Sequence, residues 1–232
     1  MDEIISYHPC SAGIRENSLL FVPMQSGGME INMNYEIEKK LYSEGYNFIA
    51  GVDEAGRGPL AGPVFAAAVV LKNGQFIEGV TDSKKLSEKK REYLFDKIID
   101  EAVCYSIAIA DEKEIDEINI RNATFRAMNT AVDNLEIIPE FVLIDGNAIK
   151  DMTLPYECVV KGDFKCNCIA AASILAKVSR DRFMLECHEL YPQYGFDKHK
   201  GYPTKLHYER IKEFGISPIH RRTFLKNIIN GK

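Results

Sequence analysis

Residues 47–71 read NFIAGVDEAGRGPLAGPVFAAAVVL, and this stretch decides the fold. The apolar run from Asn47 to Val52 predicts one strand, and the run from Val64 to Leu71, rich in Val and Ala, predicts a second. The segment between them carries two acids and three glycines, so it continues neither strand. The stretch is therefore predicted as a strand, a glycine-rich loop and a second strand.

Helices and strands alternate around this stretch. Apolar residues at helical spacing predict helices, and short apolar runs bounded by turn residues predict strands. The predicted helices are residues 35–45, 86–103, 112–117, 120–135, 166–190 and a final one that ends at Phe214; the remaining predicted strands are residues 104–110, 141–144 and 157–160. Asp111, Asn119 and Thr204 are expected to cap three of these helices. The order predicts an α/β domain with a mixed sheet flanked by helices.

Composition excludes several classes of protein. The chain has 232 residues, of which 46% are hydrophobic and 27% charged, so whole-chain disorder and coiled coil are excluded. The longest strongly apolar run, residues 64–71, is far shorter than the ~20 residues of a membrane span. The N-terminus has two early acids and no basic region, so no secretory signal is predicted and a cytoplasmic protein is expected.

Domain organisation is predicted to be simple. Residues 1–28 show no sustained periodicity and end in Ser26-Gly27-Gly28, so they are expected to form a loose N-terminal extension. Residues 29–232 are expected to form one domain, whose C-terminal part from about residue 190 is helical. A monomer is the default expectation. The six cysteines are expected to be reduced thiols, because the one close pair, Cys166 and Cys168, lacks zinc-ligand spacing.

Charge is distributed unevenly along the chain. The net charge is −5, yet residues 161–232 hold 14 Lys and Arg against 7 Asp and Glu. The last third therefore favours an anionic partner. The candidate phosphate contacts are Lys161, Lys165, Lys177, Arg180, Lys198, Lys200, Arg221 and Arg222, although each one alone also fits a solvated surface residue. Tyr202, between Gly201 and Pro203, is a candidate for stacking on a sugar or base, or else a packed loop anchor.

Carboxylates follow three of the predicted strands. Asp53, Asp145 and Asp163 each lie at or just past a strand end beside a glycine, and Glu54 doubles the first. One such acid is ordinarily a solvated loop residue. Several at neighbouring strand ends would meet at one edge of the sheet and repel one another unless a cation were present. Mg²⁺ or Mn²⁺ suits oxygen ligands, and two such ions about 4 Å apart would clamp a phosphodiester during hydrolysis.

The glycine-rich loop also allows a rival interpretation. Residues 56–61 match the G-x-G-x-x-A fingerprint of dinucleotide binding. That fingerprint opens a helix, whereas a strand is predicted to follow here, and Asp53 and Glu54 would repel a pyrophosphate. A loop of this kind can instead bring backbone N–H groups close to a sugar or phosphate.

Taken together, the motifs resemble ribonuclease HII, the bacterial type 2 ribonuclease H. The resemblance runs from about Phe48 to Phe224 and rests on residues 50–64 (AGVDEAGRGPLAGPV), 82–86 (DSKKL), 144–146 (IDG), 160–163 (VKGD), 171–178 (AASILAKV) and 198–202 (KHKGY). It implies an RNase H-like fold and divalent-metal-dependent cleavage of the RNA strand of RNA/DNA hybrids. It also implies nicking of duplex DNA on the 5′ side of embedded ribonucleotides, which leaves 3′-hydroxyl and 5′-phosphate ends.

The resemblance assigns roles to particular residues. Four residues resemble the catalytic, metal-binding carboxylates: Asp53, Glu54, Asp145 and Asp163. The loop of Gly56, Arg57 and Gly58 resembles the one that senses the ribose 2′-hydroxyl, the group that distinguishes RNA from DNA. Tyr202 resembles the residue that stacks at the ribo–deoxyribo junction. Lys84, Lys161, Ser173 and Lys177 match motif positions and are expected to contact substrate.

Two other function classes remain as alternatives. A binding module of the same fold would grip hybrids without cleaving them, but the intact set of four carboxylates argues against it. A small-molecule nucleotide enzyme that uses the glycine loop would bind mononucleotides without needing a duplex. The basic last third favours a polymer instead, and binding to a polymer would weaken steeply with salt.

Overall fold

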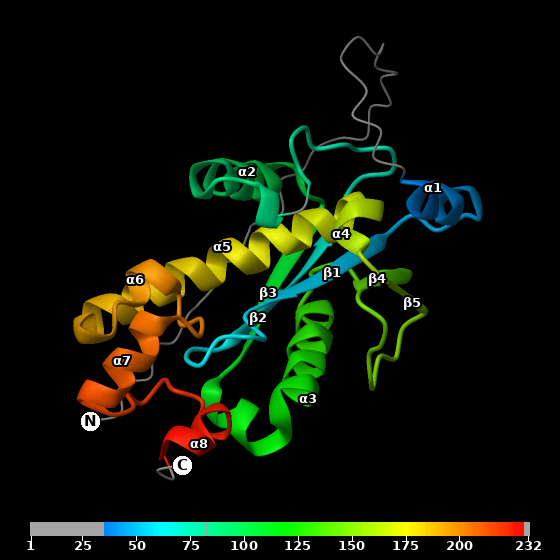
Figure 1. The fold of residues 1–232 in the computed structure, drawn as a ribbon. Helices are drawn as coiled ribbons and strands as arrows, with labels where there is room; N and C mark the ends of the chain where they lie inside the picture. Colours follow the sequence, from blue (N-terminus) through cyan, green and yellow to red (C-terminus); the bar gives the residue numbers. More distant parts are fainter. Residues whose placement is uncertain (1–34, 82, 230–232) are drawn as a thin grey trace.

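The structure is a computed structural model that describes residues 35–81 and 83–229. The predicted N-terminal extension, residues 1–28, therefore lies outside the described residues, as does Asp82 of the 82–86 motif. Within the described residues, one five-stranded sheet has the strand order β3-β2-β1-β4-β5, and helices cover both of its faces (Figure 1). The predicted mixed sheet flanked by helices is confirmed.

The central strand, β1 (Ile49–Ala55), has neighbours of both orientations. It pairs antiparallel with β2 (Val64–Val70), which pairs antiparallel with β3 (Cys104–Ala110). On its other side it pairs parallel with β4 (Phe141–Asp145), which pairs parallel with β5 (Tyr156–Val159). Because β1 and β4 are parallel neighbours, their carboxyl ends lie together at one edge of the sheet.

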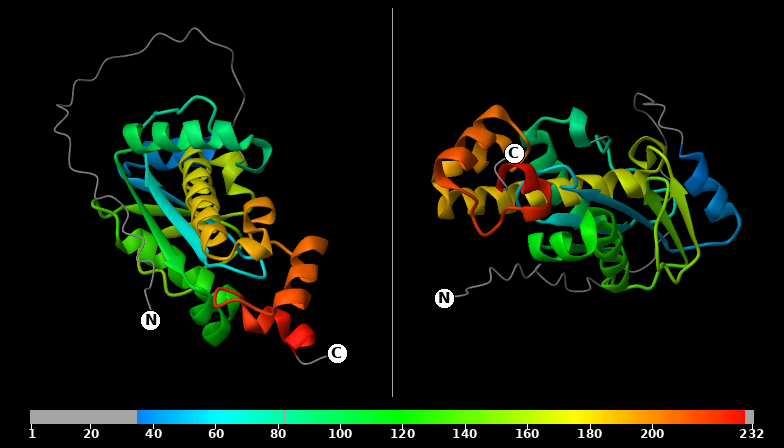
Figure 2. Two further views of the ribbon diagram at one scale, coloured as in Figure 1. Left: turned by 90° about the vertical axis from the view of Figure 1, so that its left-hand side faces the viewer. Right: turned by 60° about the horizontal axis from the view of Figure 1, so that its bottom comes forward.

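Both faces of the sheet are covered, which explains the unbroken apolar run of β2. Helices α2 (Glu88–Glu101) and α5 (Asn167–Leu190) cover one face and α3 (Glu112–Asp133) covers the other (Figure 2). Every residue of β2 is buried; Phe65, Ala67 and Val69 face the α5 side, and the residues between them face α3. A strand buried on both sides shows no polar alternation.

Helix α5 lies directly against β1 at a glycine. A Cβ atom on Gly51 would lie 2.2 Å from the carbonyl carbon of Cys168, so no other residue allows this approach. A residue of α1 (Glu36–Ser43) binds the first turn of α5. The buried carboxylate of Glu38 accepts hydrogen bonds from the backbone N–H groups of Asn167 and Cys168, at 2.8 and 3.0 Å. This contact sets the position of α5 over the sheet edge.

The predicted break at Asn119 is confirmed. The assignment of α3 is continuous from Glu112 to Asp133, but Asn119 has φ 68° and ψ 160°, outside the helical region. Its side-chain oxygen accepts hydrogen bonds from the N–H groups of Arg121 and Asn122, both at 3.1 Å. Asn119 therefore caps the second half of α3, as predicted.

The C-terminal part continues beyond the predicted last helix. After α6 (Phe196–His199) and α7 (Lys205–Phe214), which Thr204 caps as predicted, the chain forms η3 (Arg222–Leu225) and α8 (Lys226–Ile229). The prediction that the helix ending at Phe214 is the last was wrong, because these final turns are too short to show helical periodicity. The segment before η3 returns to the glycine-rich loop, where His220 forms a β-bridge with Ala61.

Two further predictions concern the described residues as a whole. The cysteines among them, five in number, are free thiols, as expected. Among residues 35–81 and 83–229, no helix has the length and apolar character of a membrane span.

Candidate active site

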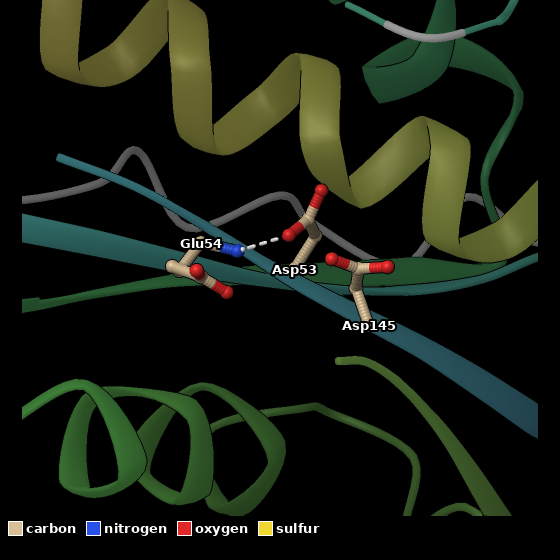
Figure 3. A group of neighbouring side chains, drawn as sticks. All are labelled: Asp53, Glu54 and Asp145. Carbon is tan, nitrogen blue, oxygen red and sulfur yellow. Dashed lines mark hydrogen bonds between the residues drawn. The ribbon is translucent and has the colours of Figure 1, made fainter. Parts of the chain in front are cut away.

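Three carboxylates meet at the carboxyl edge of β1 and β4 (Figure 3). Asp53 and Glu54 lie within β1, and Asp145 is the last residue of β4. The register pairs Val52 with Ile144, so Asp53 and Asp145 come next on neighbouring parallel strands. One carboxylate oxygen from each of the three residues lies within 4.8 Å of the other two. The strand was predicted to end at Val52, but it continues to Ala55 and carries both acids.

The three carboxylates lie on both sides of the strand. Asp53 and Asp145 point to the α5 side of the sheet, and Glu54 points to the α3 side (Figure 3). This follows from strand alternation, since Ile49 and Leu143 belong to the core on the α5 side and Val52 and Ile144 to the other. The oxygens still converge because they all lie at the open edge of the sheet.

Electrostatics at this edge favour a cation. Asp53 is 6% exposed, and burial, followed by the charges of Glu54 and Asp145, raises the pKa of its carboxyl well above its usual range. Burial also raises the pKa of Glu54, although Arg57, 3.4 Å from its carboxylate, acts in the opposite direction. Positive charge among these oxygens would reverse the rise in pKa. The donor set consists of carboxylate oxygens, which are the ligands that Mg²⁺ and Mn²⁺ prefer, so the residues fit such an ion.

Hydrogen bonds hold the two aspartates in place. The Oδ1 atom of Asp53 accepts the backbone N–H of Glu54 at 2.7 Å, and Oδ1 of Asp145 accepts the N–H of Gly162 at 2.7 Å. The hydroxyl of Ser173, on α5, also donates to Asp53 and thereby favours its ionised form. The hydroxyl of Ser173 also lies 2.9 Å from that of Ser83, the first residue of the short helix η1 (Ser83–Lys85), so Ser173 contacts both the carboxylate and η1. The predicted substrate contact at Ser173 is thus placed against a carboxylate of the cluster.

The fourth predicted carboxylate is not part of the cluster of three. Asp163 is 6% exposed and lies just past a strand, in the short helix α4 (Gly162–Lys165). The preceding strand, β5, already ends at Val159. Asp163 nevertheless directly follows Gly162, the residue that binds Asp145. It therefore lies next to the cluster, and its role as a metal ligand stays a prediction.

The glycine-rich loop is held from beneath by Arg221. The Arg221 guanidinium, 0% exposed, donates from Nη2 to the carbonyl of Gly56 at 2.6 Å, from Nη1 to that of Arg57 at 3.1 Å and from Nε to that of Gly62 at 2.8 Å. All described peptide bonds are trans, so each N–H points away from the preceding carbonyl. With the carbonyls of Gly56 and Arg57 turned toward Arg221, the N–H groups of Arg57 and Gly58 face outward.

A second buried arginine, Arg180 on α5, holds the other end of the loop. It donates from Nη2 to the carbonyl of Ala61 and from Nε to that of Pro63, both at 3.2 Å. Gly56 has φ 103°, and a Cβ atom there would lie 2.2 Å from Nε of Arg180. A glycine is therefore required at this position by both the backbone conformation and the close contact.

The prediction that Arg180 and Arg221 contact phosphates was wrong. Both side chains are 0% exposed and bind backbone carbonyls of the loop, where no phosphate reaches them. The other candidates remain accessible: Lys161, Lys165, Lys198 and Arg222 are exposed, and Lys177 and Lys200 are half-buried. The loop leads into β2 and not into a helix, which argues against the dinucleotide-binding interpretation.

Tyr202 lies beside the glycine-rich loop. Its side chain is 40% exposed, and a Cβ atom on Gly58 would lie 3.8 Å from Cε1 of the ring. The Nζ atom of Lys177 lies 5.9 Å and the Cζ atom of Arg180 5.6 Å from the ring centroid, so positive charge flanks the aromatic face. Lys177 is also bound to Asp181 at 2.7 Å. The tyrosine thus presents a supported, accessible ring next to the outward N–H groups.

The remaining predicted contacts, Lys84 and Lys161, lie around the cluster. Lys84 is exposed in η1 (Ser83–Lys85), and its charge lowers the pKa of Glu54. Lys161 is exposed, has φ 58° and directly precedes Gly162. Both lysines are therefore exposed residues near the carboxylate cluster.

Sequence reasoning missed two sets of residues at this site. It treated Arg221 as a surface contact, and it assigned nothing to the buried histidines His199, His207 and His220, which lie under Tyr202. The pair Arg221-Arg222 was visible as a basic run, but nothing in its spacing shows which of the two is buried. The histidines had no pattern that links them, because they lie in three different segments.

Comparisons with known proteins agree on one family. The family profile described as Ribonuclease HII matches residues 50–227. A ribonuclease HII from Caldicellulosiruptor saccharolyticus is 59% identical over 200 residues, which cover 86% of this chain and 98% of that protein. One from Clostridioides difficile is 54% identical over 192 residues, covering 83% of this chain and 75% of that protein.

Solved structures show the same fold. The ribonuclease H2 from Pyrococcus horikoshii OT3 is 32% identical with a TM-score of 0.66, and the match covers 76% of this chain and 93% of that one. A ribonuclease HII from Archaeoglobus fulgidus, solved in complex with PCNA, is 27% identical with a TM-score of 0.64, covering 75% of this chain and 93% of that one. The RNase H-like architecture is thereby confirmed.

Proposed function

Because this chain belongs to the ribonuclease HII family, we propose that it nicks duplex DNA on the 5′ side of embedded ribonucleotides, leaving 3′-hydroxyl and 5′-phosphate ends. The family assignment itself makes the chain a divalent-metal-dependent nuclease with ribonuclease H activity on RNA/DNA hybrids. What the proposal adds is the position of the cut, the nature of the ends and the recognition of a single ribonucleotide.

One observation carries this proposal: the outward N–H groups of Arg57 and Gly58 come three and four residues after Glu54, just past the end of β1. A phosphodiester held at Asp53 and Glu54 through bound cations would have its neighbouring sugar next to these amides. A ribose 2′-hydroxyl both accepts and donates hydrogen bonds, and a deoxyribose offers neither. The loop therefore binds the ribose next to the phosphate that is cut, and Arg221 fixes the loop before substrate arrives.

The carboxylates Asp53, Glu54 and Asp145 would hold Mg²⁺ or Mn²⁺, with Asp163 completing the set. When bound, two such cations supply charge that activates water and stabilises the leaving oxygen. Ser173 and the N–H of Gly162 orient Asp53 and Asp145 for this purpose.

The residues around the cluster bind the nucleic acid. Tyr202 stacks at the junction between the ribonucleotide and the following deoxyribonucleotide. Lys84, Lys161 and Lys177 provide positive charge for the phosphates on either side. These contacts position a duplex without reading its base sequence.

The deciding experiment uses an end-labelled DNA duplex that carries one ribonucleotide. It is incubated with Mn²⁺, with Mg²⁺ and with a chelator, next to an all-DNA duplex of the same sequence. We expect one cut, 5′ of the ribonucleotide, only with metal and only in the ribonucleotide duplex. The Asp53→Asn variant should bind the duplex and not cut it. Binding without cutting by the unaltered chain would favour a binding module, and absence of both would favour a nucleotide enzyme.

Tyr202 is tested with a matched tyrosine. Tyr208 on α7 is 42% exposed against 40% for Tyr202, but the contacts to the loop belong to Tyr202. Tyr202→Ala should weaken cleavage at isolated ribonucleotides more than cleavage of a uniform hybrid, and Tyr208→Ala should change neither. Equal activity of Tyr202→Ala on both substrates would remove the stacking role.

The working unit is proposed to be a monomeric domain over residues 29–232. In support of a single domain, the C-terminal helical part is tied to the loop through the bridge between Ala61 and His220 and through Arg221. Removal of this part would take away the groups that hold the glycine-rich loop. A single molecular mass in solution, unchanged with concentration, is the expected result of light scattering.

A further inference from the structure

Three imidazoles lie beneath Tyr202. His199, His207 and His220 are 8%, 0% and 2% exposed. The rings of His199 and His207 stack at 4.3 Å between centroids with 20° between their planes, and His207 and His220 approach at 5.2 Å. Phe196 packs its ring against all three. An apolar, closed surrounding of this kind disfavours an imidazolium.

Hydrogen bonds fix which nitrogen of each imidazole carries the proton. Nδ1 of His207 lies 3.0 Å from the carbonyl oxygen of Tyr202, which only accepts, so this Nδ1 carries the hydrogen. In a neutral ring, Nε2 of His207 then accepts. Its partner at 3.0 Å is Nε2 of His220, which must therefore donate.

The chain of bonds ends consistently at Ser217. With its hydrogen on Nε2, His220 must accept at Nδ1, and the backbone N–H of Ser217 donates to that atom at 2.9 Å. The Ser217 hydroxyl lies 2.7 Å from the same nitrogen. All donors thus point one way, from Ser217 through His220 and His207 to the Tyr202 carbonyl. A second proton on either ring would place two N–H groups face to face. Consistent with this, burial lowers the pKa of His207 to about 4 and that of His220 to about 3.

This row of hydrogen bonds connects the two segments that border the glycine-rich loop. At one end, Tyr202 is fixed through its carbonyl and through its N–H, which donates to the carbonyl of His199 at 2.8 Å. At the other end, the backbone of His220 bridges Ala61 of the loop. The N–H of Leu60 also donates to the carbonyl of Gly201 at 2.8 Å, so the loop meets the Tyr202 segment directly. The bond between the two histidines keeps the Nδ1 donor of His207 turned toward the Tyr202 carbonyl.

We infer that His207 and His220 act as a positioning pair, which holds the Tyr202 ring against the glycine-rich loop through one neutral tautomer of each imidazole. The functional part of this inference rests on the proposed role of Tyr202 at the junction. The pair itself touches no substrate, and it acts only through the Tyr202 carbonyl.

The tautomers are tested directly by nitrogen NMR of the full chain labelled in histidine. The chain holds five histidines, so assignment through single substitutions is practical. We expect at pH 7 a hydrogen on Nδ1 of His207, a hydrogen on Nε2 of His220, and a scalar coupling between the two Nε2 atoms across the hydrogen bond. An imidazolium, the opposite tautomer of either ring, or no coupling between these atoms would overturn the inference.

Function is tested with two variants of His207 that differ in the bond they keep. The amide of Asn reaches the place of Nδ1, so His207→Asn keeps a donor for the Tyr202 carbonyl and loses the acceptor for His220. The amide of Gln reaches the place of Nε2, so His207→Gln keeps the acceptor and loses the donor. Each variant loses one buried hydrogen bond, so a purely structural role predicts equal effects.

The readout is kcat/KM on a duplex with one ribonucleotide, divided by kcat/KM on a uniform hybrid. His207→Gln should lower this ratio by roughly 10–100-fold, because a misplacement of about 1 Å far from the chemistry can cost about 100-fold in rate. His207→Asn, which keeps the donor for the Tyr202 carbonyl, should largely keep the ratio. In a Tyr202→Ala background the two variants should have equal ratios. Equal ratios with Tyr202 present overturn the inference. If Tyr202→Ala alone leaves the ratio unchanged, the proposed role of Tyr202 fails instead, and the NMR result decides on the pair.

Discussion

The Nη2 atom of Arg221 donates a 2.6 Å hydrogen bond to the carbonyl oxygen of Gly56, 165 residues earlier in the chain. The same guanidinium also binds the carbonyls of Arg57 and Gly62. A loop of glycines has many accessible conformations, and three bonds from one planar group select a single one. The direction of the loop amides next to the carboxylate cluster is therefore set by the C-terminal part of the chain.

Arg221→Lys should damage both stability and substrate recognition. A lysine reaches at most one of the three carbonyls and leaves the others buried without a donor, so we expect the free energy of unfolding to fall by roughly 2–4 kcal/mol. The KM for a duplex with one ribonucleotide should rise, since the amides of Arg57 and Gly58 lose their fixed direction. Urea denaturation and steady-state kinetics measure the two effects.

The neighbouring arginine provides the control for this prediction. Arg222 is exposed, and its backbone N–H, not its guanidinium, binds Asp116 at 2.8 Å. Arg222→Lys should therefore leave the urea midpoint within experimental error. Equal loss of stability in both variants would mean that the bonds from Arg221 to the loop do not stabilise it.

Much of the fold could be predicted from local patterns. The runs of β1 and β2, the caps at Asp111, Asn119 and Thr204 and the length of α5 are all properties of neighbouring residues. Apolar periodicity and cap chemistry act over a few residues, so a single sequence reveals them. The convergence of Asp53 and Asp145 was also predictable, because parallel neighbouring strands end at one edge.

Local patterns could not reveal partners that lie far apart in the chain. Arg180 and Arg221 have the same local signature as a surface arginine, and only the fold shows that loop carbonyls surround them. Asp163 follows an apolar run, as the other acids do, yet the chain has already turned into α4. The relation between His207 and His220 depends on where three segments meet, which no spacing records.

Asp53→Asn should abolish cleavage and yet stabilise the protein in chelator. Burial and the charges of Glu54 and Asp145 raise the pKa of Asp53, so in the absence of metal the ionised carboxyl destabilises the folded state above the usual pKa of an aspartate. A neutral amide removes this penalty. We expect a higher Tm than the unaltered chain in chelator at pH 7, and activity lower by more than about 100-fold. Thermal unfolding in chelator measures the change in Tm, and the cleavage assay measures the loss of activity.

The response to Mn²⁺ separates this explanation from a simple packing effect. A ligand that binds only the folded state raises Tm with concentration. Addition of Mn²⁺ should raise Tm of the unaltered chain and should have little effect on Asp53→Asn. An Asp53→Asn variant that is less stable in chelator, or that responds fully to Mn²⁺, would contradict the assignment of Asp53 as a ligand.

Asp163→Asn should have a graded effect. Asp163 lies outside the group of three carboxylates, next to Gly162, which orients Asp145. We therefore expect cleavage to fall by about 10–100-fold, while the rise in Tm with Mn²⁺ is largely kept. Complete loss of the Mn²⁺ response in Asp163→Asn would instead make this residue an equal member of the first metal site.

The buried histidines should make stability depend on pH. Burial lowers the pKa of His207 to about 4 and of His220 to about 3, from an ordinary value of 6.5. Below pH 6.5 the unfolded chain takes up protons that the folded chain does not, so the free energy of unfolding falls by up to roughly 1.4 kcal/mol per pH unit for each histidine. Urea titrations in chelator from pH 7.5 to about 5 measure the free energy of unfolding of the unaltered chain and of His220→Asn. The difference between the two at each pH removes the contribution of the carboxylates and should show this slope for His220. Parallel curves would mean that His220 is protonated equally in the folded and unfolded states.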